Sequence, residues 1–418
     1  MADITINIST GSHSVLKIDC GSSSPKVGGE VDLSQFIFLR EFNGGDNNLS
    51  SVTGLNSSNT LSRIEIPGEN TVGFNLSDLP LSLEYLDIQG ANTVTGDIGD
   101  LPTILEFLRI TGNTTVGGSV GSLPSAINHI EIRGNNTISG NIADLPSSAS
   151  YVQISGNNEI SGNLNEVNCP NCLHLSIEGN DHALEGNINN LPPLLTYLNI
   201  SSGNTSILST RGNVGGDIQN LPSTLNTYIN ETIGAVTGTL ATLPPTLEVF
   251  EMTSGSTRPP GEGNLVSGNI VDLPSTLKRF DLRARNTTTG NLFDLPPGIT
   301  HYGNSGFNTA NRYYDGTVTG TGLRQWAPNM RLFLMFPAAP SITPRMPVGE
   351  LVTLLIDLSL TSWDATEDPS DPSLPLIQVS GASNPTINLT TYPSALAAIL
   401  SLRAQGVTVL VNTTGGPG

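Results

Sequence analysis

A sequence unit that recurs about every 22 residues constrains this chain more than any other feature. The dipeptide Leu-Pro marks each unit, and Cys169-Pro170 takes its place once. Two of the spacings between units are longer by eight residues. A repeat of this length predicts a solenoid, in which each unit is one coil that buries its apolar face against its neighbours. The leucines of the dipeptide are Leu79, Leu101, Leu123, Leu145, Leu191, Leu221, Leu243, Leu273 and Leu295.

Each coil contains an alternating segment and a glycine step. In Leu86-Asp87-Ile88 two apolar residues flank a polar one, which predicts a short strand with one buried face. Further along the coil, Gly96 precedes the apolar Ile98, and this glycine is expected to mark a bend. A coil of this length leaves little room for an α-helix, so its return path is expected to be extended or 3₁₀-helical.

An asparagine follows each strand. Its side chain is expected to hydrogen-bond the backbone groups that the turn leaves free. Repeated in every coil, these side chains would form a polar ladder along the stack. The residues are Asn92, Asn113, Asn136, Asn158 and Asn180.

The pattern resembles the leucine-rich-repeat family, and the Gly-x-Ile step resembles the plant-type variant of that family. The resemblance covers about 33–316, although the chain lacks the proline after Gly-x-Ile and the paired-cysteine caps of the plant type. It implies a β-rich leucine-rich-repeat solenoid with short parallel strands and few helices. The first coil and the segments after Glu350 and Tyr392 are similar to those of phage and bacterial surface leucine-rich-repeat proteins.

The pattern changes at both ends of the repeat. Beyond Thr321, apolar spacing predicts two helices, 348–360 and 393–405, and strands at Leu332, Ile377 and 407–412. We therefore predict three parts. These are an N-terminal β cap or attachment segment (1–32), a solenoid of about twelve coils (33–322) and an α/β C-terminal cap (323–418).

Charge and apolar content exclude several partners. The chain has 17 basic and 36 acidic residues, a net charge of −19, so it lacks the positive surface that nucleic acid requires. No run of 18 apolar residues predicts membrane insertion. The N-terminal residues lack the basic region and apolar core of a signal peptide. We therefore expect the chain to remain where it is made or to leave without a cleaved signal, as a virion component does.

No pattern in the sequence predicts catalysis, a cofactor or a metal. Ser119 lies in a Gly-x-Ser-x-Gly match, but the surrounding glycines belong to the repeat and no strand-elbow-helix context accompanies them. The odd number of cysteines excludes a fully paired disulfide framework, and one Cys-x-x-Cys is a poor zinc signature. Cys169 is instead expected to fill a leucine position. We therefore expect a protein that is not an enzyme and holds no cofactor or metal.

Two columns of outward-facing strand residues form the candidate binding site. The first is rich in flat rings, and the second carries charges and amides. Such a stripe suits carbohydrate, because sugar C–H faces stack on rings while hydroxyls pair with carboxylates and amides. Equally, aromatic residues simply favour strands and cover neighbouring coils. The residues are Tyr85, Phe107, His129, Tyr151, His174 and Tyr197 in the first column, and Asp87, Arg109, Glu131 and Gln153 in the second.

Three functional hypotheses follow. The first is a phage tail-fibre or baseplate adhesin that binds a host surface glycan or protein and contacts other tail proteins. The second is a structural virion decoration protein, and the third a bacterial surface adhesin. The expected location is the virion exterior or, alternatively, the cell surface. The two eight-residue insertions, within 201–213 and 253–264, are expected to project from one edge as further binding loops, although drift would look the same.

Overall fold

The computed structural model describes most of the repeat region and parts of both ends. The described residues are 15–21, 26, 28–179, 183–201, 212–232, 234–252, 265–282, 286–305, 318–319, 332–336, 348–361, 363, 375–379 and 386–415. Contacts group the chain into two units. The first comprises Met1–Gly186 and Asn190–Gly212, and the second comprises Asn187–Asn189 and Asn213–Gly418.

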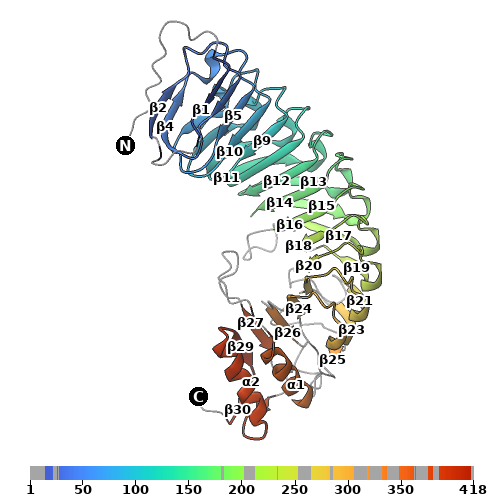
Figure 1. Cartoon of the computed structure of the whole chain (residues 1–418). Coiled ribbons are helices and arrows are strands. Elements are labelled where there is room, and N and C mark those ends of the chain that lie inside the picture. Colours follow the sequence, from blue (N-terminus) through green and yellow to red (C-terminus); the bar gives the residue numbers. More distant parts are fainter. Residues whose placement is uncertain are drawn as a thin grey trace. The chain divides into compact units, whose positions relative to one another are not determined.

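In the first unit, the strand that opens each coil pairs in parallel with the same strand of the next coil (Figure 1). We call this the first ladder. Leu86 and Ile88 are at most 1% exposed, which confirms the predicted alternation. The strands are β1 (Lys17–Asp19), β3 (Glu41–Asn43), β5 (Arg63–Ile66), β7 (Tyr85–Ile88), β9 (Phe107–Ile110), β11 (His129–Asn141), β12 (Tyr151–Gly156), β14 (His174–Gly179) and β16 (Tyr197–Ser201).

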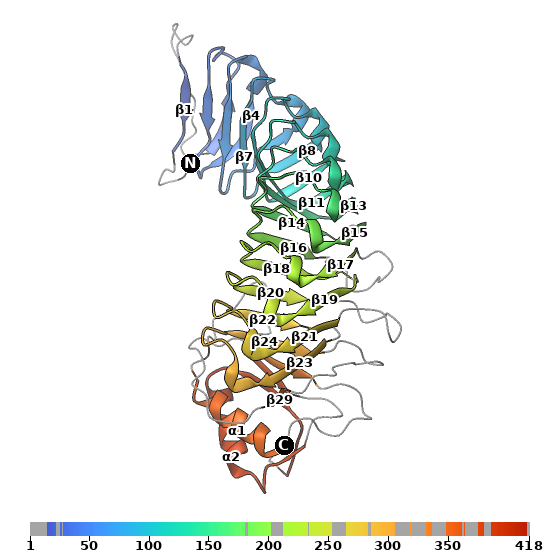
Figure 2. The same ribbon diagram turned by 90° about the vertical axis from the view of Figure 1, so that its right-hand side faces the viewer.

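The glycine step of each coil lies at the end of a second strand, where only a bend was expected. These strands pair in parallel from coil to coil and form the second ladder (Figure 2). Asn75 pairs with Thr95, whereas the residue at the same repeat position in the next coil is Asp97. The second ladder is therefore offset by two residues from the repeat. The strands are β6 (Gly73–Asn75), β8 (Thr93–Asp97), β10 (Asn113–Ser119), the end of β11, β13 (Glu159–Asn163) and β15 (Ala183–Asn187); nearer the N-terminus β2 (Gly28–Asp32) pairs with β4 (Asn48–Thr53).

One turn of 3₁₀ helix follows the strand that ends in the glycine step, as predicted. From η3 to η8 the turn begins at a side chain that accepts the N–H two residues on, as Asn75 Oδ1 accepts from Ser77 N at 3.1 Å, whereas η2 begins at Gly54. Gly96 has φ 111°, and a Cβ there would lie 2.7 Å from Asn75 Oδ1. The glycine is therefore required by the cap of the preceding coil. The turns are η2 (Leu55–Ser57), η3 (Leu76–Asp78), η4 (Ile98–Asp100), η5 (Val120–Ser122), η6 (Ile142–Asp144), η7 (Leu164–Glu166) and η8 (Ile188–Asn190).

The predicted asparagine ladder is confirmed with one correction. Asn92 is fully buried, accepts from Val72 N and donates to two carbonyl oxygens, and Asn136 and Asn158 are buried in the same way. Asn113 is exposed, so its assignment was wrong. Thr114 occupies the buried position instead and donates to Arg133 O at 2.8 Å. Asn180 lies outside the described residues.

The coil that carries Cys169-Pro170 buries two cysteines. Cys169 and Cys172 are both fully buried and unpaired in disulfides. Cys172, which lies two residues before the strand, occupies the position of Leu83 in its coil, and its N–H donates to Cys169 O at 3.0 Å. Cys169, which stands in place of the leucine of the Leu-Pro dipeptide, is buried as expected of an apolar side chain, and Cys172 fills a second apolar position of the same coil. Both thiols pack as small apolar side chains.

The second unit contains two parallel ladders of its own. Its first ladder comprises β18 (Thr227–Asn230), β20 (Val249–Met252), β22 (Arg279–Leu282), β24 (His301–Ser305), β26 (Leu332–Phe336), β27 (Leu376–Val379) and β29 (Thr408–Val411). Its second ladder comprises β17 (Asn213–Asp217), β19 (Val236–Thr239), β21 (Leu265–Asn269), β23 (Asn286–Asn291) and β25 (Val318–Thr319). The 3₁₀ turns are η10 (Ile218–Asn220), η11 (Leu240–Thr242), η12 (Ile270–Asp272) and η13 (Leu292–Asp294).

Two α-helices near the C-terminus match the predicted ones within one residue. They are α1 (Val348–Ser359) and α2 (Pro393–Ala404), and β28 (Ile387–Asn388) pairs with β30 (Thr413–Thr414) beside them (Figure 1). Leu355 and Leu402 are fully buried at the apolar faces of the helices. The part of the chain that the structure describes holds no helix with the length and apolar character to cross a membrane.

Several predictions are not tested. The boundaries 1–32, 33–322 and 323–418 stay predictions. Residues 1–14 of the expected N-terminal cap lie outside the described residues, as do nearly all of the two insertions. The β1 strand of the N-terminal segment pairs in parallel with β3, so it lies in the same ladder as the repeats.

Candidate functional site

Strand register brings the predicted ring residues together. Successive coils pair these residues directly, Tyr85 with Phe107, Phe107 with His129 and onward to Tyr197. The residue after each ring is fully buried, as Leu86 is, so the ring itself lies on the opposite side of the sheet. All six rings are half-buried. We call Tyr85, Phe107, His129, Tyr151, His174 and Tyr197 the ring column.

The ring column is a continuous face-to-face stack. Neighbouring ring centroids are 4.1–4.4 Å apart, and their planes differ by 8–12°. The guanidinium carbon of Arg63 lies 3.6 Å from the centroid of Tyr85 and covers that end of the stack. The ring faces between Tyr85 and Tyr197 are therefore used by neighbouring rings, and along this length the column presents ring edges. The rings thus cover one another from coil to coil, as the alternative explanation for this column expected.

A row of paired charges runs beside the rings. Arg109 lies between two carboxylates, with Nη1 at 3.2 Å from Asp87 Oδ2 and Nε at 3.0 Å from Glu131 Oε2. The other carboxylate oxygen of Glu131, Oε1, lies 2.8 Å from Arg133 Nη2. The side chains of Asp87 and Glu131 are only 13% and 10% exposed. We call Asp87, Arg109, Glu131 and Arg133 the charge row; its pairing holds these long side chains in one arrangement.

Amide and hydroxyl groups continue the charge row. Gln153 Oε1 accepts from Arg133 Nη2 and from the hydroxyl of Tyr151, both at 2.7 Å. Glu178 Oε1 accepts from Ser176 Oγ at 2.6 Å. The tyrosine bond joins the ring column to the charge row. All four predicted residues of the second column therefore belong to one hydrogen-bonded surface, and Arg133 is a member that the sequence analysis missed.

Burial shifts the ionisation of the two histidines. Burial, together with the positive charge of Arg133, lowers the pKa of His174 to about 4. The pKa of His129 is also lowered, by burial and by Arg109. The Nε2 atom of each ring is buried without a hydrogen-bond partner. Both imidazoles are therefore neutral near pH 7 and act as flat members of the stack.

The pKa values of a carboxyl group and three phenol groups on this surface are raised. Burial raises the pKa of Asp87, although Gln89 and Arg109 oppose this effect. Burial also raises the pKa of Tyr85, Tyr151 and Tyr197, so the phenols stay protonated. The stack thus carries no ionised ring at neutral pH. Its charges are confined to the neighbouring row.

In the second unit four aromatic residues of the first ladder lie on the inner side of the strands. The outward positions hold Thr227, Val249, Arg279 and His301. One residue later in each strand lie the fully buried Tyr228, Phe250, Phe280 and Tyr302, with centroids 5.5–5.9 Å apart. A shift of one residue exchanges the two faces of a strand. An outward ring column is therefore a feature of the first unit.

The remaining candidate positions have structural partners. Ser119 Oγ accepts from Gly121 N at 3.3 Å and caps η5. Within the described ranges, no three His, Cys, Asp or Glu side chains are grouped closely enough to hold a metal ion. The described surface of the two columns offers ring edges, paired charges and amides.

Comparisons with known proteins identify the fold. No family model and no curated protein sequence matches the chain. A solved plant peptide hormone receptor, RGFR1 in complex with RGF2, is similar with a TM-score of 0.52 and 17% identity, over 93% of this chain and 66% of the receptor chain. An internalin, InlF of Listeria monocytogenes, matches over 61% of this chain and 81% of its own, with 14% identity and a TM-score of 0.32. The chain thus spans about two-thirds of the receptor chain, and it has the leucine-rich-repeat fold.

Proposed function

We propose that this chain is a non-enzymatic binding protein whose ring column and charge row recognise a protein on another surface. The observation that carries the proposal is the six-ring stack joined by hydrogen bonds to a paired row of charges. Rings locked by their neighbours lose little conformational freedom on binding, which favours association. Ring edges with adjacent carboxylates and guanidinium groups match the polar and apolar mixture of a protein surface.

A protein partner agrees with this geometry better than a glycan does. Sugar recognition by aromatic side chains uses the ring faces, and those of the ring column are already stacked at 4.1–4.4 Å. The RGFR1 receptor, which shares the fold, is solved in complex with RGF2. We therefore place a protein receptor ahead of a glycan.

The biological setting we propose is the exterior of a bacteriophage particle, at a tail fibre or baseplate, with a host surface protein as receptor and other tail proteins as neighbours. Two features support it: the resemblance of the opening coil and the C-terminal segments to phage and bacterial surface leucine-rich-repeat proteins, and the low content of charged residues, 13%. A structural virion decoration protein and a bacterial surface adhesin are the alternatives. In the decoration role the same surface would bind only neighbouring subunits.

Competition for host adsorption tests the proposal. Purified protein in molar excess is expected to block adsorption of the phage to its host. Binding to particles without binding to cells would favour the decoration role. Labelling of uninfected bacteria by an antibody to the chain would favour the cellular adhesin. Adsorption that is unchanged at large excess would exclude receptor binding.

Site variants locate the surface. Replacing Tyr151→Ala and Tyr197→Ala together is expected to weaken binding to host cells at least tenfold, because two ring edges and the bond to Gln153 are lost. Leu81→Ser is the control, since Leu81 is 83% exposed and lies outside the strands. Circular dichroism checks that each variant is folded. Equal binding by the double variant and the control would remove the ring column from the site.

A further inference from the structure

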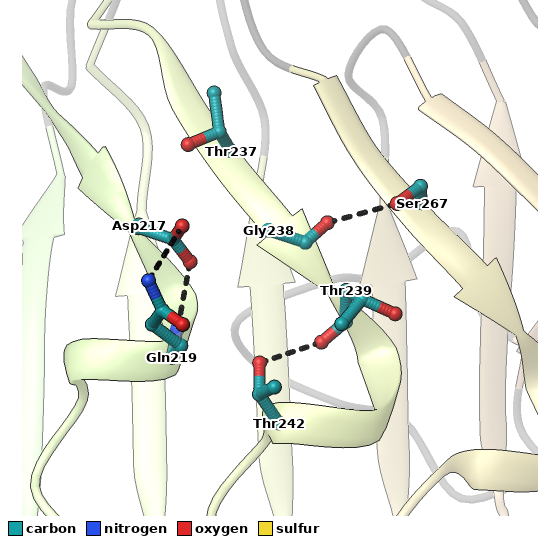
Figure 3. Close-up of a pocket in the computed structure, with 7 residues that line it drawn as sticks. All are labelled: Asp217, Gln219, Thr237, Gly238, Thr239, Thr242 and Ser267. Atoms are coloured by element: carbon teal, nitrogen blue, oxygen red, sulfur yellow. Dashed lines mark hydrogen bonds between the residues drawn. The ribbon is translucent and has the colours of Figure 1, made fainter.

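A small cavity lies on the second ladder of the second unit, separate from the ring column. Its volume is about 330 Å³. Figure 3 shows its wall, which comes from the end of β17 with η10, from β19 with η11, and from β21. Seven residues line it: Asp217, Gln219, Thr237, Gly238, Thr239, Thr242 and Ser267.

The hydroxyl groups of this wall present mainly acceptors. Thr237, Ser267 and Thr242 each donate to a backbone carbonyl oxygen, at 3.4, 3.2 and 2.8 Å respectively. A hydroxyl has one hydrogen to donate and two lone pairs. Once the hydrogen is given to the backbone, only the lone pairs face the cavity.

Asp217 adds a negative charge to the same wall. Its Oδ1 accepts from Gln219 N at 3.0 Å, and its Oδ2 accepts from Gln219 Nε2 at 3.1 Å (Figure 3). Each carboxylate oxygen keeps a free lone-pair site. The side chain is half-buried, so its charge is partly shielded from water. The cavity is therefore negative and rich in acceptors.

Thr239 distinguishes this coil from its neighbours. The same position in other coils holds a side chain that caps the 3₁₀ turn, such as Asp217 for η10 and Asn269 for η12. Thr239 makes no such capping hydrogen bond. Its shorter, half-buried hydroxyl is left at the wall of the cavity as one more oxygen.

We propose that this cavity binds a primary ammonium group, such as a lysine side chain of a partner protein presents. An ammonium is compact, positive and carries three donors, which complements a wall of acceptors around one carboxylate. An anion would be repelled. A sugar would lack a stacking ring, since none of the seven lining residues is aromatic. A guanidinium favours two parallel hydrogen bonds to one carboxylate, and Gln219 already takes one lone-pair site on each oxygen of Asp217, whereas an ammonium needs only one of the remaining sites.

Titration of the full chain with n-butylammonium, followed by saturation-transfer NMR of the ligand, tests this proposal. We expect saturable binding with a dissociation constant on the order of 1–10 mM. Asp217→Asn should weaken it about fivefold, the scale of one partly exposed charge pair. Asparagine caps the same turn in other coils, as Asn75 and Asn269 do, so the variant keeps its fold.

Asp97→Asn is the matched control, because Asp97 caps η4 in the same way but does not line the cavity. Binding by this variant should equal that of the wild type. Four results would overturn the proposal: no saturable binding, an equal effect of both substitutions, tighter binding of n-butylguanidinium, or binding of glucose in place of the ammonium. Because the lining residues of the cavity and those of the ring column are different, these results are independent of the adsorption experiment.

Discussion

Replacing Gly96→Ala tests the explanation for the glycine column. Gly96 has φ 111°, where a side chain is strained by about 1–3 kcal/mol. Its added Cβ would lie 2.7 Å from Asn75 Oδ1 and 3.1 Å from Leu76 N, in the cap of η3. That cap is held by Ser77 N and Ser77 Oγ, at 3.1 and 2.9 Å, and disrupting it costs about 0.5–2 kcal/mol. The expected loss of unfolding free energy is about 2–4 kcal/mol.

Gly73→Ala is the matched control in the adjacent strand of the same ladder. Gly73 lacks a positive φ, and nothing lies within 4 Å of its added Cβ, so the change should be neutral or stabilise by about 0.4–1 kcal/mol. Urea unfolding followed by circular dichroism measures both variants. With a slope of roughly 2–3 kcal/mol per molar, the midpoint of Gly96→Ala should fall by about 1 M.

A double-mutant cycle separates the clash from the backbone strain. Asn75→Ala alone removes the cap. Combined with Gly96→Ala, it also removes the atom that the new Cβ meets, so the double variant should cost less than the sum of the two single variants. Strict additivity, or a Gly96→Ala midpoint equal to that of Gly73→Ala, would refute the reasoning.

Three further changes probe the ladder, the stack and the charge row. Asn92→Ala should cost about 2–4 kcal/mol in urea unfolding, because it removes three hydrogen bonds to buried backbone groups, whereas the exposed Asn113→Ala should change stability by less than about 0.5 kcal/mol. Burial lowers the pKa of His174 in the folded protein to about 4, below its ordinary 6.5, so the stability that the neutral ring contributes is fully present above pH 6.5 and is lost as the pH falls from 6.5 to 4. His174→Phe should therefore flatten the dependence of the unfolding free energy on pH between 4 and 6.5. An unchanged pH profile would contradict this pKa. Glu131→Gln should cost about 1–3 kcal/mol, since Arg133 loses its carboxylate partner and Arg109 keeps only Asp87, and the exposed Glu106→Gln should cost almost nothing. Equal midpoints would show that the charge row does not stabilise the fold.

Much of the architecture could be predicted because burial repeats locally along the chain. The alternation at Leu86 and Ile88 predicts a strand with one buried face, and the structure buries both. The helix spacing near Leu355 was likewise sufficient to predict α1. The alternating pattern at Leu86 and Ile88 involves residues only a few positions apart, so the sequence of one coil is enough to predict the strand.

The site was harder to predict. Residue type and spacing placed the six rings in one column, but the same pattern fits rings that face solvent and rings that face each other. The choice depends on the approach of neighbouring coils and the side-chain torsions, which give centroid separations of 4.1–4.4 Å. Arg133 could not be placed in the site from the sequence, because one of its two partners, Gln153, belongs to the next coil. Its other partner, Glu131, lies two residues away in the same strand.

The amino-acid sequence by itself determined the repeat, the buried columns, the 3₁₀ turns and the two C-terminal helices, because these follow from apolar periodicity and local backbone preference. Tertiary structure alone decided the two-residue offset of the second ladder, the choice of Thr114 over Asn113, the stacking of the rings and the cavity beside Asp217. Each of these arises where side chains about twenty residues apart meet across coils. The register between neighbouring coils and the side-chain torsions then determine which surfaces are covered and which remain open, and no single coil specifies either of them.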